Sequence, residues 1–271
     1  MTAPLLIVGA GYLGSEIARQ AGDHPVVTTT KSGGGPHEAC DLSSSDDVAA
    51  LARRHPVPEV VIHCASSGRG GAEAYCEVFI QGAQNLARSF PDSHLILTSS
   101  TSVYHQTDGS EVDEASLTRP IRETSQLLLE AEQIILGTGG TVARLAGLYG
   151  PGRSVILRKF LEGNAAIEED GRRILNQIHV EDAASAVLHL ALQKTKGLFN
   201  VSDDRPLSQL ECYQGLAEHF RLPLPPVGEK NTSRKRAWTH KAVQNHKIRA
   251  TGWHPRFPCF FDALDQLAAT P

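Results

Sequence analysis

Three glycines near the start of the chain have the spacing of a phosphate-binding turn. Gly9, Gly11 and Gly14 form the pattern G-x-G-x-x-G, after the apolar run 5–8 and before the helix-like segment 15–22. In such a turn the first glycine allows a tight bend, the second lets a diphosphate approach the backbone, and the third lets the helix pack on the strand. The pattern alone is weak, but its place at the start of a strand-turn-helix unit predicts a dinucleotide site rather than a glycine-rich turn without a ligand. Tyr12 and Leu13, inside the turn, belong to the predicted site.

The end of the second predicted strand, 26–30, indicates which dinucleotide binds. An NAD site places an acid there for the ribose 2′-hydroxyl, but this sequence has no acid between Asp23 and Glu38. It has Thr30, Lys31 and Ser32 instead, a cation with two hydroxyls that suits a 2′-phosphate. The sequence therefore predicts NADP(H), with NAD as the weaker alternative. Lys31 could also be a solvated loop lysine.

A third short strand is expected to close at Asp41 and Leu42, which would lie near the adenine, although Asp41 could instead cap a turn. Ser45 is the expected N-cap of the next helix, because acids follow it in the first turn. Further strands are expected at 60–63, 94–98, 141–148 and 197–201, and further helices at 75–90, 122–136, 180–192 and 207–220.

This alternation predicts an α/β fold, a Rossmann-type doubly wound parallel sheet with a smaller C-terminal lobe for the substrate. The predicted domains are 1–150, which would bind the dinucleotide, and 151–271, with 176–196 returning to pack on the first.

Composition excludes several other classes. The chain has 271 residues, 41% of them hydrophobic, and a net charge of −4, so neither a nucleic acid nor a membrane partner is expected. The N-terminal apolar run lacks a basic flank and a cleavage site, which argues against a signal peptide. Five widely spaced cysteines predict free thiols and a cytoplasmic location. No histidine or cysteine spacing indicates a metal site.

Several motifs, in the right order, resemble the extended short-chain dehydrogenase/reductase (NAD-dependent epimerase/dehydratase) family. They are GAGYLG, CDL, HCAS (63–66), TSSTSVY (98–104), RLAGLYGPG (144–152) and NQIHVEDAASAV (176–187). The resemblance implies that Cys64, Ala65, Ser66 and Leu148 line the cofactor. It also implies that Ser100 binds the reacting carbonyl. The neighbouring positions that would meet the substrate are Ser67, Thr101, His105, Arg153 and His179. His105 and His179 could equally be ordinary structural histidines.

The sequence departs from that family where its acid-base pair belongs. The Y-x-x-x-K tyrosine falls at Thr124 and the lysine at Leu128. Neither can replace the pair, because a threonine hydroxyl is too weak an acid and leucine carries no charge. The chain thereby resembles the atypical YeeZ-like subgroup, which also lacks the pair. Tyr104 is the nearest tyrosine that could supply a proton, although packing is its more common use in the family.

Two functions remain open. One is an NADP(H)-dependent oxidoreductase, epimerase or dehydratase acting on a small polar substrate. The other is a non-catalytic NADP(H)-binding sensor or regulatory protein. Segment 229–256 has eight basic residues against one acid, Glu229, which suits an anionic substrate or simply a solvated surface. An apolar stripe in 122–136 would allow a homodimer as well as a monomer; it comprises Leu127, Leu128, Ile134 and Ile135.

Overall fold

The computed structural model describes residues 4–68, 70–168, 170–229 and 239–269. The chain forms two compact units, each assembled from separated segments. The first contains 1–103, 119–144 and 184–199, and the second contains 104–118, 145–183 and 200–271. The domain division expected at residue 150 stays a prediction. The basic residues Lys230, Arg234, Lys235 and Arg236 lie outside the described residues.

A seven-stranded sheet forms the centre of the first unit, in the order β12-β7-β5-β4-β1-β2-β3. The strands are β1 (Leu5–Val8), β2 (Val26–Thr30), β3 (Glu38–Ala39), β4 (Val60–His63), β5 (His94–Ser100), β7 (Thr141–Leu145) and β12 (Gly197–Val201). Neighbouring strands from β5 to β3 pair in parallel. Every residue of β1 and β4 is buried, as expected where a parallel sheet is covered on both faces. The predicted α/β fold class is confirmed.

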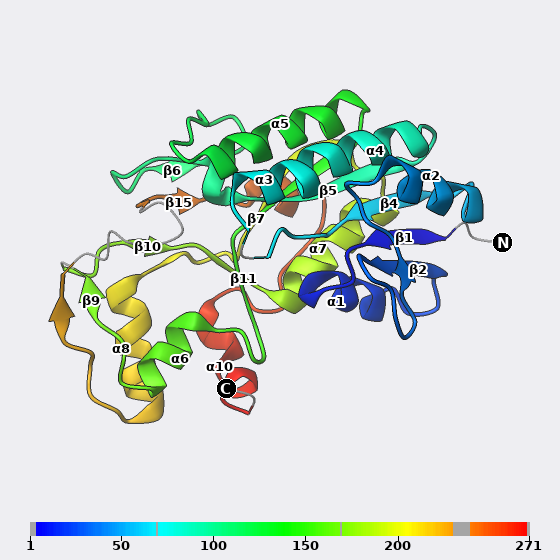
Figure 1. Cartoon of the computed structure of the whole chain (residues 1–271). Coiled ribbons are helices and arrows are strands. Elements are labelled where there is room, and N and C mark those ends of the chain that lie inside the picture. Colours follow the sequence, from blue (N-terminus) through cyan, green and yellow to red (C-terminus); the bar gives the residue numbers. More distant parts are fainter. Residues whose placement is uncertain (1–3, 69, 169, 230–238, 270–271) are drawn as a thin grey trace. The chain divides into compact units, whose positions relative to one another are not determined.

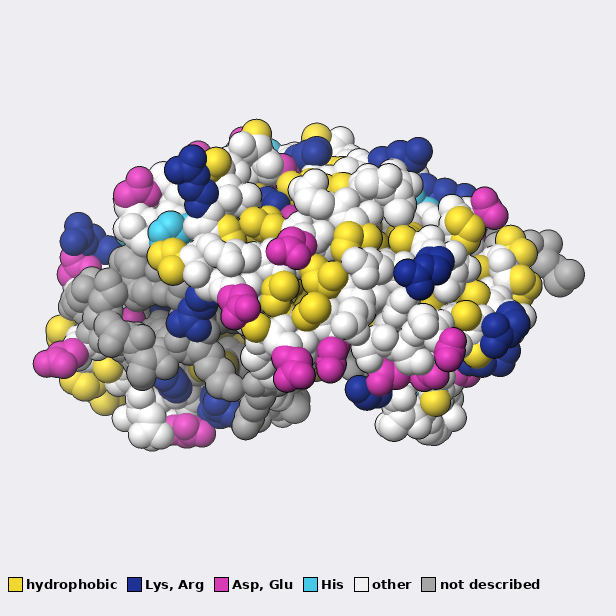
Figure 2. Space-filling view, turned by 45° about the horizontal axis from the view of Figure 1, so that its top comes forward, with side chains coloured by type: hydrophobic (Ala, Val, Ile, Leu, Met, Phe, Trp, Pro, Cys, Tyr) yellow, Lys and Arg dark blue, Asp and Glu magenta, His cyan; other side chains and the backbone are white. Residues whose placement is uncertain are grey.

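Helices cover both faces of this sheet (Figure 1). They include α1 (Tyr12–Gln20), α2 (Ser45–Arg54), α3 (Ala72–Tyr75), a π-helix (Cys76–Gln81), α4 (Gly82–Ser89) and α5 (Glu123–Gly137). Figure 1 shows α2, α4 and α5 on one side of the strands and α1 on the other. Leu128 and Ile135 of α5 are buried, whereas Leu127 and Ile134 are half-buried. Figure 2 shows apolar side chains gathered among charged ones over this helical layer.

Three local expectations are wrong. The strand expected at 141–148 is two strands, Thr141–Leu145 in this sheet and Gly147–Tyr149 in the second unit. The third strand is Glu38–Ala39, because Asp41 Oδ1 accepts hydrogen bonds from the backbone N–H and hydroxyl of Ser43 and turns the chain there. The N-cap of α2 is Ser44 rather than Ser45, because the hydroxyl oxygen of Ser44 accepts the hydrogen bond from the backbone N–H of Asp47, three residues later.

The second unit is built from short paired strands and helices. β8 (Gly147–Tyr149) pairs with β11 (Gln177–His179), β10 (Ile174–Leu175) with β13 (Leu207–Ser208), β9 (Ile167–Glu168) with β14 (Val227–Gly228), and β6 (Glu111–Val112) with β15 (Ala242–Val243). The helices are α6 (Val155–Leu161), α8 (Gln209–Phe220), α9 (His246–Arg249) and α10 (Leu264–Ala268), and α7 (Val180–Leu192) begins here. Ser208 and Glu211 form a capping box at the start of α8.

An aromatic and aliphatic core holds the second unit together. Tyr149, Leu157, Phe160, Leu216 and Phe260 belong to one buried cluster. The five cysteines of the chain are free thiols, and Cys40, Cys212 and Cys259 are buried. Within the described ranges, no helix has the length and apolar character needed to cross a membrane.

Candidate functional site

The glycine turn after β1 is shaped by two contacts of the protein with itself. Gly9 has φ +100°, and a Cβ there would lie 2.3 Å from the backbone nitrogen of Ala65. A Cβ on Gly14 would lie 2.3 Å from the carbonyl oxygen of Gly9. Gly11 differs, because a Cβ there would meet no atom within 4 Å. The chain therefore needs glycine at 9 and 14 for its own packing, and it leaves open space beside Gly11.

The first turn of α1 begins directly at this open space. Gly11 is the N-cap residue of the helix and supplies no side-chain cap. Tyr12 is the first helical residue, and Leu13 and Gly14 are buried. Amide groups of a first helical turn lack acceptors within the helix and carry a partial positive charge, which suits an anionic group. The geometry of the turn therefore fits a diphosphate.

The segment after β4 lies against the same turn. Cys64 donates its backbone N–H to the carbonyl of Val8 (2.8 Å), which carries the chain past the end of β1. The close approach of Ala65 to Gly9 brings the two predicted cofactor segments together. Ser66 accepts a hydrogen bond from Gly68 N–H, and Ser67 accepts one from Gly70 N–H through its carbonyl. Burial raises the pKa of the Cys64 thiol to about 12, so this cysteine stays protonated.

The predicted 2′-phosphate contacts follow β2. Lys31 is 75% exposed, and its Nζ lies 2.8 Å from Asp41 Oδ2. The hydrogen bond and charge of Asp41 raise the pKa of Lys31, and Lys31 in turn lowers the pKa of Asp41. Thr30 donates its hydroxyl to the carbonyl of Gly33, and Ser32 is exposed. Lys31 is thus held next to the end of β2 by an exposed ion pair, a contact weak enough for an anion to replace.

Leu42 and His63 are both part of the packing of the first unit, and the role of Leu42 toward the adenine stays a prediction. Leu42 is buried, and its carbonyl accepts a hydrogen bond from Asn85 Nδ2 (2.9 Å). His63 Nε2 donates to the carbonyl of Val78 in the π-helix (2.9 Å). Burial lowers the pKa of His63 to about 4, so the ring is neutral at physiological pH. It therefore acts as a structural donor.

Some hydroxyl groups at the end of β5 donate hydrogen bonds within the protein, whereas the hydroxyl of Ser100 can still donate to a ligand. Ser99 donates its hydroxyl to Glu132 Oε1 (2.6 Å), and Thr98 donates to the carbonyl of His63. Ser100 is half-buried at the last position of the strand, where its hydroxyl accepts from Ser102 N–H (3.2 Å). Its own O–H remains able to donate. Thr101 is buried in the short turn that follows.

Glu132 of α5 and Arg144 of β7 form a buried ion pair beside Ser99. Their side chains are 0% and 5% exposed, and Arg144 Nη2 lies 2.6 Å from Glu132 Oε2. Arg144 Nε adds two further contacts to the same carboxylate. Thr124 and Leu128, the positions of the absent acid-base pair, lie on the same helix, and Leu128 is buried. Sequence reasoning missed this pair.

In the second unit, Tyr104 is fully buried, and its hydroxyl donates to Asn200 Oδ1 (2.9 Å). That is the arrangement of a structural tyrosine, and its catalytic assignment stays a prediction. His105 follows it and is half-buried. His179 is also fully buried, with its ring centroid 5.2 Å from that of Tyr149 and 4.3 Å from that of Phe257.

Two other predicted positions lie close in sequence in the second unit. Leu148 is half-buried in β8, in register with Ile178 of β11. Arg153 is exposed in the turn after β8, where its backbone N–H donates to the carbonyl of Gly150. Their roles toward cofactor and substrate stay predictions.

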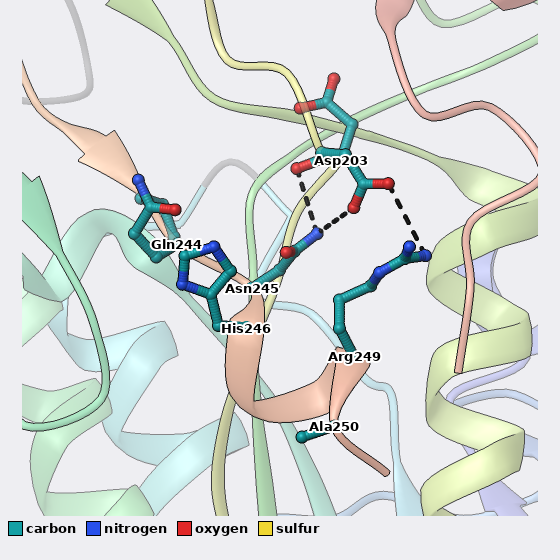
Figure 3. Close-up of a pocket in the computed structure, with 8 residues that line it drawn as sticks. Asp203, Gln244, Asn245, His246, Arg249 and Ala250 are labelled. Atoms are coloured by element: carbon teal, nitrogen blue, oxygen red, sulfur yellow. Dashed lines mark hydrogen bonds and ion pairs between the residues drawn. The ribbon is translucent and has the colours of Figure 1, made fainter. Parts of the chain in front are cut away.

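A hollow of about 370 Å³ lies on the second unit (Figure 3). It is lined by Asp203, Asp204, Val243, Gln244, Asn245, His246, Arg249 and Ala250. Asn245 Nδ2 donates to the carbonyl of Asp203 and to Asp204 Oδ1, and Arg249 lies 3.6 Å from Asp204. Figure 3 shows Gln244 and His246 together on the other side of Asn245 from Arg249. These bonds fix the loop itself. No cluster of His, Cys, Asp or Glu among the described residues could hold a metal ion.

Two basic side chains of the second unit, Arg173 and Lys241, bind the same residue, and the sequence analysis did not predict that they lie together. Lys241 is 3% exposed, and its Nζ donates to the Tyr104 carbonyl and to Thr239 Oγ1, both at 3.0 Å. Arg173 Nε donates to the Thr239 carbonyl (3.3 Å). The basic character of 229–256 was the available signal, but it does not reveal which lysine is buried.

The sheet, the glycine turn and the segment beside it define a Rossmann-type dinucleotide-binding protein. The chain belongs to the NAD dependent epimerase/dehydratase family, whose sequence model matches residues 5–202. It is 33% identical over 174 residues to Protein YeeZ of Escherichia coli (strain K12), a match that covers 61% of this chain and 58% of YeeZ. It is 26% identical over 157 residues to a 3-diazoavenalumate denitrifying reductase of a Streptomyces species, which covers 52% of each. The chain thus spans just over half the length of these curated relatives.

Solved structures show the same fold. The UDP-glucose 4-epimerase of Thermus thermophilus, in complex with NAD, superposes with a TM-score of 0.82 at 19% identity, over 98% of both chains. At this identity the likeness establishes the architecture.

Proposed function

We propose that the chain is an NADP(H)-dependent oxidoreductase, or a related epimerase or dehydratase, that acts on a small polar, anionic substrate. The observation that carries the proposal is the open space beside Gly11, next to a glycine turn that the protein otherwise packs tightly. Family membership and the NAD bound to the Thermus thermophilus neighbour support a nicotinamide cofactor at this turn. When bound, that cofactor would supply or accept a hydride.

The chain's own residues would orient the reactants. The turn and the first amides of α1 would hold the diphosphate, and Cys64 to Ser66 would line it. Ser100 would donate its hydroxyl to the reacting carbonyl from the end of β5, where open α/β sheets bind ligands. Because Thr124 and Leu128 replace the usual acid-base pair, the proton would come from another group or from water. A substrate that needs little acid assistance fits this site.

The preference for NADP(H) depends on Lys31. Its ammonium is exposed and paired with Asp41, and Thr30 and Ser32 flank it. A 2′-phosphate carries more negative charge than a single carboxylate and would draw Lys31 away from Asp41. An exposed contact of this kind is worth about 1 kcal/mol. Lys31→Ala should therefore weaken NADPH binding by about fivefold and leave NADH binding nearly unchanged.

Substitutions in the turn test the cofactor site. Gly11→Ala should keep the unfolding temperature of the ligand-free protein, because its Cβ meets no protein atom, yet weaken NADPH binding by about tenfold or more. Fluorescence titration with NADPH and NADH gives both affinities. Gly137→Ala is the matched control, because a Cβ there also meets nothing and the position lies at the end of α5. Equal NADPH binding by Gly11→Ala and Gly137→Ala would contradict the proposed site.

One arrangement favours a second candidate, a non-catalytic NADP(H)-binding sensor or regulatory protein. The Y-x-x-x-K positions are Thr124 and Leu128, and the Tyr104 hydroxyl is already engaged with Asn200. The two candidates differ in turnover. The enzyme should oxidise NADPH with at least one member of a panel of carbonyl and imine compounds, and Ser100→Ala should slow it. Tight NADPH binding without oxidation by any compound would favour the sensor.

A further inference from the structure

Asn245 lies between the two ends of the hollow on the second unit (Figure 3). Its side chain is 5% exposed. Its Nδ2 donates to the carbonyls of Ser202 (2.9 Å) and Asp203 (3.2 Å) and to Asp204 Oδ1 (2.8 Å). An amide nitrogen carries two hydrogens, so three acceptors occupy it fully and establish which end of the amide is the oxygen. The fold therefore sets the orientation of this side chain.

The oxygen of the Asn245 amide has no partner in the described part of the chain. Oδ1 accepts no hydrogen bond there, and Figure 3 shows it on the side of Gln244 and His246. The side chains of Gln244 and His246 also make no hydrogen bond to a described residue. A carboxamide and an imidazole can each donate and accept, and a buried amide oxygen is stabilised when a donor reaches it. This end of the hollow therefore fits a neutral group that donates and accepts, such as a carboxamide.

Arg249 and Asp204 form the opposite, charged end of the hollow. Arg249 Nη1 lies 3.6 Å from Asp204 Oδ2, which is too long for a hydrogen bond, and each side chain is 30% exposed. The guanidinium donates no hydrogen bond to any residue that the structure describes. The carboxyl group of Asp203 points away from Asn245 in Figure 3, so Asp204 is the acid at this end. One cation and one anion thus lie side by side with unused hydrogen-bonding capacity.

A ligand with adjacent opposite charges would satisfy both groups at once. A carboxylate can accept two parallel hydrogen bonds from the planar guanidinium of Arg249, and an ammonium can donate to Asp204 Oδ2. In an α-amino acid both groups are bonded to the α-carbon, so their charges are about as far apart as those of Arg249 and Asp204. A simple anion would instead be repelled by Asp204, and a simple cation by Arg249. The charged end therefore favours a zwitterion.

We propose that the hollow binds a free α-amino acid with a neutral amide side chain, of the glutamine type. Its ammonium and carboxylate would meet Asp204 and Arg249, and its carboxamide would donate to Asn245 Oδ1. The volume of about 370 Å³ is within the range of small-molecule sites. The hollow belongs wholly to the second unit and uses no residue of the glycine turn, so the proposal goes beyond the proposed function and does not rest on it.

The first test compares ligands on the wild-type protein by isothermal titration calorimetry, without nucleotide. L-Glutamine should bind with a dissociation constant of about 1 mM or less. N-Acetyl-L-glutamine lacks the ammonium and L-glutaminamide lacks the carboxylate, so each should bind about tenfold more weakly or worse. L-Norleucine keeps both charges but lacks the carboxamide, and it should also bind more weakly than L-glutamine. No binding of L-glutamine, or equal binding of either blocked analogue, would overturn the proposal, and equal binding of L-norleucine would overturn its neutral amide end.

The second test removes the charged end. Arg249→Gln and Asp204→Asn should each weaken L-glutamine binding by about tenfold or more, because each takes away one of the two charges. Arg158→Gln is the matched control, because Arg158 of α6 also belongs to the second unit and pairs with an acid, Glu162 at 4.0 Å, outside the hollow. This variant should bind L-glutamine like the wild type. Wild-type affinity in both Arg249→Gln and Asp204→Asn would contradict the site.

Folding of the variants is checked by circular dichroism. If Arg249→Gln or Asp204→Asn does not fold, the comparison of ligands on the wild type decides the proposal alone. NADPH titration of the same samples reports the glycine turn independently. Binding of L-glutamine without binding of NADPH would leave the amino-acid site standing and remove the oxidoreductase, and binding of NADPH alone would do the reverse.

Discussion

Each unit of the molecule buries basic side chains, but their charges are balanced differently. In the first unit, Arg144 on β7 is enclosed with Glu132, and three contacts join the guanidinium to the carboxylate. In the second unit, Lys241 and Arg173 share neutral acceptors, with no acid beside them among the described residues. The first arrangement is complete without a ligand and holds a helix to the sheet. The second keeps a buried ammonium next to a guanidinium, and burial together with the charge of Arg173 lowers the pKa of Lys241 to about 8.

Breaking the balanced pair should give the largest effect. Glu132→Gln removes the buried carboxylate charge that compensates Arg144, so the free energy of unfolding should fall by about 3–5 kcal/mol. Urea unfolding measures it. Glu130→Gln changes an exposed residue of the same helix and should stay within about 0.5 kcal/mol of the wild type. Equal stability of Glu132→Gln and Glu130→Gln would show that the Glu132–Arg144 ion pair does not stabilise the fold.

The buried ammonium of Lys241 should make the stability of the wild type depend on pH, and Lys241→Met should remove that dependence. The pKa of Lys241 is about 8 in the folded protein against 10.5 for an ordinary lysine, so the unfolded chain binds this proton more tightly. Wild-type stability should then increase relative to Lys241→Met between pH 8 and pH 10.5, by roughly 3 kcal/mol at the limit. Below pH 8 the difference should be constant. Urea unfolding of both proteins at several pH values checks this, and parallel curves throughout would refute the unbalanced charge.

The second unit also buries an acid, Asp203, without a balancing charge within the described ranges, and its replacement should change the free energy of unfolding by a smaller amount. Asp203 is 2% exposed, its Oδ1 has no hydrogen-bond partner among the described residues, and burial raises its pKa well above the usual value. The ionised form is therefore disfavoured in the fold, and stability declines as pH rises above the ordinary aspartate pKa. Asp203→Asn should be more stable than the wild type by about 1–2 kcal/mol at about pH 7, with the advantage lost near about pH 4. Thermal unfolding at the two pH values measures it.

Asp204→Asn is the natural control for that substitution. Asp204 adjoins Asp203 but accepts from Asn245 and lies near Arg249, so its neutralisation should not stabilise the protein. A gain in stability from Asp204→Asn alone would show that the balance of charge around Asp203 has been misjudged.

Local patterns were sufficient to predict most of the first unit. The strand 5–8, the turn with Gly9, Gly11 and Gly14, and the helix after it follow from residues adjacent in sequence, and the fold class is confirmed. The predicted end of the third strand and the predicted N-cap of α2 are wrong by one to three residues. Their positions depend on hydrogen bonds that Asp41 and Ser44 accept, and the run of three serines at 43–45 does not show which serine is the cap.

Side-chain partners distant in sequence could not be predicted in this way. Glu132 resembles its neighbour Glu130 in the sequence, and only the packing of α5 against the sheet buries one and exposes the other. Lys241 and Arg173 are brought together by Asn176 and Thr239, and a count of basic residues cannot show that. The π-helix at Cys76–Gln81, which supplies the acceptor for His63, also has no signal in the hydrophobic pattern.

The enclosed thiols described above have a practical consequence for labelling. Burial raises the pKa of Cys40 to about 11 and of Cys64 to about 12, and it also raises the pKa of Cys212 and Cys259. Alkylating reagents attack the thiolate, so these four sulfurs should react slowly at neutral pH. Cys76 is a fifth free thiol and is only half-buried, so it would be changed to serine first. In that variant, a cysteine introduced at an exposed position such as Arg153 would carry a fluorophore or spin label in preference to these four thiols.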